Sequence, residues 1–69
     1  KLLGLDLPSV DHLDAKVLQN HHALAGAGIV IVESLELNEV EGGVYNFVAF
    51  PLKIAGGDGS PVRAILWRE

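Results

Sequence analysis

The sequence predicts an α/β fold with one amphipathic helix and a mostly antiparallel sheet. A helical repeat of apolar residues is followed by runs of β-branched and aromatic residues that are typical of strands. The chain has 69 residues and no cysteine, so it forms one domain at most and has no disulfide framework. This length is near the lower limit for a self-sufficient core.

The first half of the chain predicts a short strand over residues 2–7, a loop that Pro8 begins, and a helix over residues 13–27. On a helical wheel Val17, Leu24 and His21 lie on the same stripe as the first residue of this helix. Possible caps are Asp11 or Asp14 at its start and a left-handed Gly26 or Gly28 at its end.

The second half of the chain predicts strands. Ile29 to Val32 is a β-branched run that ends at Glu33, and a helix followed by such a strand is half of an α/β unit. Val44 to Ile54 reads as a long strand bent near its proline, and Val62 to Trp67 reads as the last strand. The glycine-rich segment between these two strands lacks a phosphate-binding motif, so we expect an antiparallel hairpin turn.

Both faces of the long predicted strand are mostly apolar, which predicts that each face is covered. One helix and four strands are too few to cover them, and burial stabilises by about 25 cal/mol per Å² of apolar surface. We therefore expect the chain to pack against residues outside this sequence, against another copy of itself, or against both. The apolar side chains concerned are Val44, Tyr45, Phe47, Val48, Ala49, Phe50 and Leu52.

Charge and composition exclude some classes of partner. The net charge is −4 and the five basic residues are scattered, so we expect no nucleic-acid binding. The apolar runs are shorter than the ~20 residues that a membrane span needs, so we expect no membrane partner. The absence of cysteine is compatible with a reducing compartment, and we expect a cytoplasmic protein. The chain begins with Lys1 and contains no methionine, which leads us to expect a fragment of a longer product.

Four ordered blocks of sequence resemble the C-terminal part of the cyclase-like hydrolases that include bacterial kynurenine formamidase. Gly4–Asp11 is similar to a segment of the form G-x-D-x-P-S-x-D, and His21 followed by Gly28–Leu35 resembles a histidine, a helix end and a strand that closes on glutamate. Phe50–Lys53 and Asp58–Ala64 are similar to the terminal strands. The resemblance covers essentially the whole chain, residues 1–69.

The resemblance implies a strongly twisted or barrel-like sheet, incomplete here, in an oligomeric, metal-dependent amide hydrolase. It implies hydrolysis of N-formylkynurenine to kynurenine and formate. It also implies that His21 and Glu33 are metal ligands, that Glu33 bridges two ions, and that the ions are zinc or manganese. An imidazole nitrogen and a carboxylate oxygen suit such divalent ions.

His22 is the competing ligand candidate. Neighbouring residues on a regular helix point about 100° apart, so two adjacent histidines cannot both face one ion. His21 lies about 80° from Leu13, within the apolar stripe, and His22 lies about 180° away, so we favour His21. Without the resemblance, His21 would be a core or interface histidine, and Glu33 would cap a neighbouring helix or pair with Arg63.

The family carries an N-terminal motif of the form H-x-G-T-H-x-D-x-P-x-H. The resemblance implies that this motif supplies most of the metal ligands and the acid/base histidine. The motif is absent from this sequence. With His12 in a loop, we expect no catalytic residue in this chain and no competence alone. Asp6, Asp11 and Asp14 suit turn and capping roles better than a metal cluster. The alternative function is a non-catalytic remnant that serves as an oligomerisation or interaction module.

Overall fold

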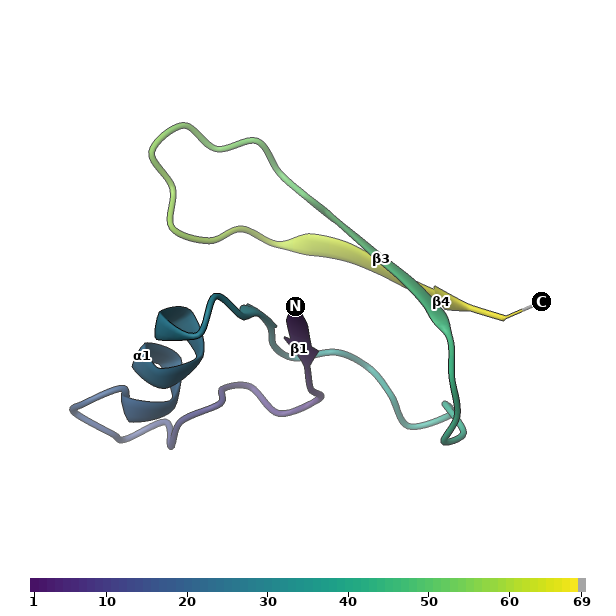
Figure 1. Ribbon diagram of the computed structural model, residues 1–69, viewed down its shortest axis with the longest axis horizontal. Coiled ribbons are helices and arrows are strands. Elements are labelled where there is room, and N and C mark those ends of the chain that lie inside the picture. Colours follow the sequence, from purple (N-terminus) through teal and green to yellow (C-terminus); the bar gives the residue numbers. More distant parts are fainter. Residues whose placement is uncertain (69) are drawn as a thin grey trace.

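The computed structural model describes residues 1–68, so Glu69, the last residue of the expected unit, lies outside it. Residues 1–68 form one helix and four strands in two small sheets (Figure 1). This confirms the expected incomplete α/β class, although the strands form two sheets rather than one. The elements are β1 (Leu2–Gly4), α1 (Gln19–Gly26), β2 (Val30–Val32), β3 (Asn46–Pro51) and β4 (Val62–Trp67).

The first sheet is a parallel pair with α1 in the connection. Residues 2–4 of β1 pair in register with residues 30–32 of β2, and parallel neighbours need such a crossover. Backbone pairing continues past the strand ends, because Ser34 N–H donates to the carbonyl of Leu7 at 2.8 Å. The segment after β2 is therefore held alongside the loop that follows β1.

Helix α1 is shorter than the sequence predicts. It begins at Gln19 rather than at Leu13, so the predicted N-terminal half of the helix is wrong. The carboxylate of Asp11 accepts the backbone N–H groups of Asn20 at 2.9 Å and His21 at 3.0 Å. These are donors that a helix leaves unpaired in its first turn, so Asp11 stabilises a start at this point. Asp11 is thus a capping residue as predicted, but it caps from the preceding loop, 9 and 10 positions before the two N–H groups that it accepts.

The end of α1 follows the prediction. Gly28 has a φ of +73°, the left-handed conformation that glycine adopts without steric cost. Ile29 N–H donates to the carbonyl of Leu24 at 2.9 Å, and Gly28 N–H donates to that of Ala25 at 3.0 Å. These two bonds form a Schellman motif, which ends the helix and turns the chain directly into β2.

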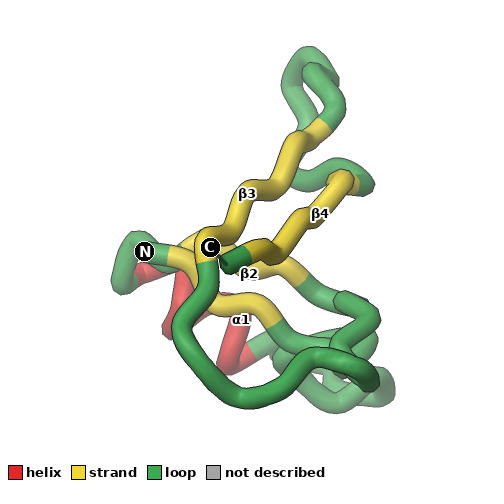
Figure 2. The backbone as a smooth tube through the Cα atoms, turned by 90° about the vertical axis from the view of Figure 1, so that its right-hand side faces the viewer, coloured by secondary structure: helices red, strands yellow, loops and turns green. Residues whose placement is uncertain are grey.

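The second sheet is the expected antiparallel hairpin of β3 and β4, with Asn46 opposite Trp67 and Pro51 opposite Val62. Figure 2 shows the hairpin standing away from the β1–α1–β2 unit. Within residues 1–68, β3 and β4 do not pack closely against α1, β1 or β2. An open space therefore separates the two sheets.

The described part of the chain has almost no core. Val32 is the one buried apolar side chain within residues 1–68, at 7% exposure, whereas Phe50 is 58% exposed and Trp67 is 46% exposed. A domain with a core of its own buries such side chains. No helix in this range is both long enough and apolar enough to cross a membrane.

Candidate functional site

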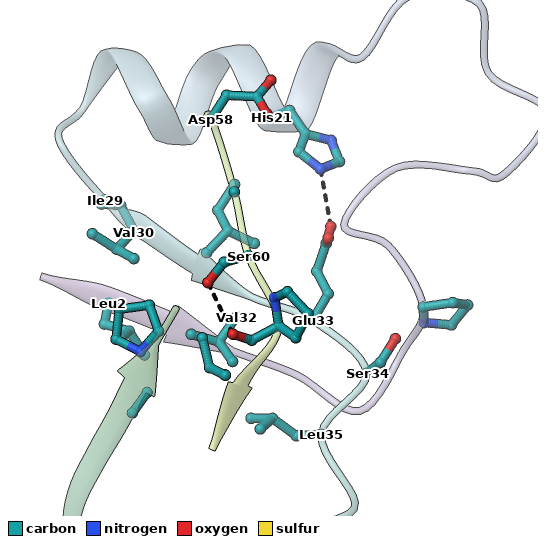
Figure 3. Close-up of a pocket in the computed structure, with 17 residues that line it drawn as sticks. Leu2, His21, Ile29, Val30, Val32, Glu33, Ser34, Leu35, Asp58 and Ser60 are labelled. Carbon is teal, nitrogen blue, oxygen red and sulfur yellow. Dashed lines mark hydrogen bonds and ion pairs between the residues drawn. The ribbon is translucent and has the colours of Figure 1, made fainter. Parts of the chain in front are cut away.

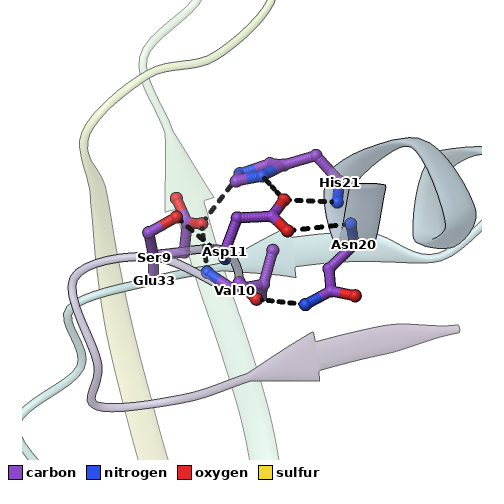
Figure 4. Close-up of polar contacts among 6 residues, drawn as sticks. All are labelled: Ser9, Val10, Asp11, Asn20, His21 and Glu33. Carbon is purple, nitrogen blue, oxygen red and sulfur yellow. Dashed lines mark hydrogen bonds and ion pairs between the residues drawn. The ribbon is translucent and has the colours of Figure 1, made fainter. Parts of the chain in front are cut away.

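The structure brings together the two residues that the sequence selects. The Nε2 atom of His21 lies 2.9 Å from Oε2 of Glu33 (Figure 4). His21 belongs to the first turn of α1, and Glu33 directly follows β2. Because α1 turns tightly into β2, the start of the helix lies near the end of the strand. The two side chains, 12 positions apart in sequence, therefore meet.

Asp11 is the third member of the site. Its Oδ2 atom lies 2.8 Å from Nδ1 of His21, on the opposite side of the imidazole from Glu33. The side chain of Asp11 is 7% exposed, against 31% for His21 and 29% for Glu33. The carboxylate is therefore enclosed by its partners, whereas the other two side chains remain accessible to a ligand.

Backbone groups of the same loop complete the network. Val10 N–H donates to Oε2 of Glu33 at 3.1 Å, and the Asn20 side-chain amide donates to the carbonyl of Val10 at 2.7 Å. The neighbouring residues Val10 and Asp11 thus hold Glu33 and His21, respectively. Within residues 1–68 no buried side-chain nitrogen or oxygen lacks a hydrogen-bond partner.

The network shifts the pKa values of two of its members. Burial would raise the pKa of Asp11, but the backbone N–H groups of His21 and Asn20 and the His21 ring outweigh it, so this pKa lies below its ordinary value of 3.8. The hydrogen bond to Asp11 raises the pKa of His21 above its ordinary value of 6.5, against partial burial and with help from the charge of Glu33.

These shifts predict the pH range in which the contact between Asp11 and His21 is strongest. Because the pKa of His21 is raised in the folded state, the contribution of His21 to folding stability is complete below pH 6.5. This contribution is lost as the pH rises through the folded-state pKa. Because the pKa of Asp11 is lowered in the folded state, the contribution of Asp11 to folding stability is complete above pH 3.8 and is lost on acidification.

In an NMR titration without metal, Asp11→Asn should lower the pKa of His21. Asp14→Asn removes the same charge outside the network and should leave the pKa of His21 unchanged. An unchanged His21 pKa in Asp11→Asn would contradict this prediction.

The remaining candidates lie outside the network. The side chains of His12 and His22 are exposed and form no hydrogen bond or ion pair with any residue in the range 1–68. Arg63 lies on β4 and is not the partner of Glu33, so that alternative is wrong. The structure places His21, and not His22, beside Glu33. The metal role remains a prediction.

Sequence reasoning assigned Asp11 only a capping or turn role and missed its contact with His21. A signal existed. A histidine that binds a metal through one ring nitrogen almost always donates its other N–H to a carboxylate, a carbonyl or water. Asp11 lies in the loop directly before the helix, so it was within reach of that nitrogen.

The pair faces an open cleft of about 1060 Å³ between the two sheets (Figure 3). His21 and Glu33 line one side, and Ala49 of β3 and the turn residues Asp58 and Ser60 line the other. The cleft gives a small molecule access to the pair. Its far wall is formed by the hairpin alone.

The site offers two donors that suit a divalent ion, the Nε2 atom of His21 and the carboxylate of Glu33. Asp11 lies on the Nδ1 side and cannot reach the same ion. Within residues 1–68, no group of three or more His, Cys, Asp or Glu side chains is arranged to hold a metal. Catalytic zinc sites take three protein ligands, so the donors present fit part of such a site.

Fold and site together define this chain as an incomplete α/β arrangement with a histidine–carboxylate pair. Over nearly its whole length the chain is homologous to part of kynurenine formamidase. It is 55% identical over 65 residues to "Kynurenine formamidase" of Salinibacter ruber. The aligned residues make up 94% of this chain and 31% of that protein. It is 50% identical over 66 residues to the Bacillus cytotoxicus protein of that name and 52% identical over 66 residues to that of Geobacillus thermodenitrificans.

The resemblance on which the site was predicted is thereby confirmed. The chain spans about a third of the length of the curated relatives that it matches, 31–32% in these three cases. No protein-family model matches the chain. No solved structure matches it significantly.

Proposed function

We propose that this chain is the C-terminal part of a metal-dependent amide hydrolase of the kynurenine formamidase type, which converts N-formylkynurenine to kynurenine and formate. The observation that carries the proposal is the 2.9 Å contact between His21 and Glu33. Homology to proteins named kynurenine formamidase supports the substrate, and the donor chemistry of the pair supports a metal.

In this proposal His21 and Glu33 hold the metal, zinc or manganese. His21 would hold an ion through Nε2, and Glu33 would hold it through its carboxylate, with the bridging role for Glu33 that the resemblance implies. When bound, the divalent ion supplies Lewis acidity, which lowers the pKa of water to about 7. Asp11 contacts Nδ1 on the other side of the His21 ring, and Val10 N–H donates to the Glu33 carboxylate.

Two donors are too few for a catalytic site, so the remaining ligands and the acid/base histidine come from residues outside this sequence. We use the term complete polypeptide for this sequence joined to the other two-thirds of a full-length relative, such as the Salinibacter ruber protein. In the complete polypeptide the added segment also covers apolar surface of the hairpin. A second copy is the other candidate cover, because oligomers are implied by the resemblance.

The 69-residue chain alone is expected to show no formamidase turnover and no tight metal binding. Activity and bound metal should appear in the complete polypeptide, or when the chain is mixed with a polypeptide that carries the missing histidine motif. Turnover of N-formylkynurenine and metal content measure this directly. Activity of the isolated chain would contradict the claim that the catalytic group lies elsewhere.

The alternative function is a non-catalytic remnant that acts as an oligomerisation module. The observation in its favour is the exposure of Phe50, Trp67 and other apolar side chains. This alternative predicts self-association of the 69-residue chain, together with no metal binding or activity after the missing segment is added.

For the enzyme we also propose a cytoplasmic location and no nucleic-acid or membrane partner.

A further inference from the structure

The loop between β1 and α1 contacts both candidate ligands through adjacent residues. Asp11 contacts Nδ1 of His21 at 2.8 Å, and Val10 N–H contacts Oε2 of Glu33 at 3.1 Å. Asp11 also accepts the first-turn N–H groups of Asn20 and His21 at 2.9 and 3.0 Å. One enclosed carboxylate therefore fixes the backbone and the ring of the same histidine (Figure 4).

We infer that Asp11 is the positioning residue of this site: it selects the imidazole tautomer of His21 that carries the proton on Nδ1 and leaves the Nε2 lone pair directed toward the ligand side. This inference rests on the proposed metal site for its functional meaning. It concerns a residue that touches neither the metal nor the substrate.

The tautomer matters because two acceptors compete for one ring proton when the imidazole is neutral. Glu33 lies 2.9 Å from Nε2 and Asp11 lies 2.8 Å from Nδ1, so both nitrogens have an acceptor. A proton on Nε2 would occupy the lone pair that a metal needs. Asp11 opposes this outcome, because the alternative tautomer would place the Nδ1 lone pair against its carboxylate.

The two backbone hydrogen bonds make Asp11 effective in this role. They hold the carboxylate against the first turn of α1, so the acceptor cannot rotate away from the ring without losing both N–H groups. Enclosure of the Asp11 side chain, 7% exposed, also keeps water from replacing it. Ring orientation is therefore coupled to the start of the helix.

The test uses the complete polypeptide labelled with ¹⁵N-histidine, in chelator and at a pH where the ring is neutral. Chemical shifts of the two ring nitrogens of His21 report which one carries the proton. In the unsubstituted protein we expect the proton on Nδ1. In Asp11→Ala, Glu33 is the remaining acceptor, so the proton should move to Nε2.

The conservative variant Asp11→Asn should rescue the Nδ1 tautomer, because its amide oxygen can accept from both His21 N–H groups. A merely structural role would not produce this pattern. Zinc affinity should fall about 10- to 100-fold in Asp11→Ala and less in Asp11→Asn. Asp14→Ala is the matched control and should change neither readout.

A neutral His21 ring with its proton on Nε2 in the unsubstituted protein would overturn the inference, and this measurement does not depend on whether Asp11→Ala folds. An unchanged tautomer in folded Asp11→Ala would also overturn it. If the unsubstituted protein binds no zinc although the tautomer depends on Asp11, the proposed metal function fails and the positioning of the ring stands.

Discussion

In the complete polypeptide, His21→Ala is expected to abolish tight binding of the ion at His21 and to lower formamidase turnover by more than about 100-fold, the upper limit for residues that act through a ligand. The substitution removes Nε2, one of the two converging donors, and leaves Glu33 without the partner now at 2.9 Å. Metal per chain after gel filtration and the rate of N-formylkynurenine hydrolysis measure the effect.

His22→Ala is the matched control for this prediction. It removes the same side chain one position along, where the ring is exposed and lies outside the network. Metal content and turnover should stay within about twofold of the unsubstituted protein, as for surface substitutions. Loss of metal in His22→Ala with retention in His21→Ala would reverse the ligand assignment.

The resemblance implies that His21 and Glu33 meet, and the structure shows that local geometry produces this contact. A helix that ends at Gly28 and turns directly into a β-branched strand brings its first turn to the end of that strand. The glycine, the β-branched run and the wheel position of His21 are all local signals. The register of the hairpin is local in the same way, since it depends on one turn.

The start of α1 could not be predicted because a side-chain contact from the preceding loop fixes it. Residues 13–18 have helical spacing, yet Leu13 is 79% exposed and Val17 is 65% exposed, so this apolar stripe has nothing to pack against within residues 1–68. Helical stability depends mostly on such packing. The carboxylate of Asp11 instead caps the chain at Asn20 and His21.

The role of Asp11 was missed for a related reason. Two cap candidates, Asp11 and Asp14, lie near the start of the predicted helix, and the sequence does not distinguish between them. Only the path of the loop, which runs beside the segment after β2, turns Asp11 toward the ring. The sequence of a short strand does not specify which other strand it pairs with. The separation of the strands into two sheets could therefore not be predicted either.

The second large effect is expected from Glu33→Gln in the complete polypeptide. If the carboxylate bridges two ions, its loss should remove both from the site, whereas His21→Ala removes a ligand of one ion. A neutral amide oxygen is a weaker donor and cannot offset the charge of two cations. The amide can still accept Val10 N–H, now at 3.1 Å from Oε2, so the segment after β2 should keep its place.

Metal stoichiometry decides between the roles that Glu33 can have. Glu39→Gln is the matched control, because it removes one exposed carboxylate outside the network and should leave the metal content unchanged. Loss of one ion in Glu33→Gln would make Glu33 a terminal ligand rather than a bridge, and retention of both ions would remove it from the site. A bridge requires that Glu33→Gln lose more metal than His21→Ala, because the two ions share the carboxylate and only one of them uses the imidazole.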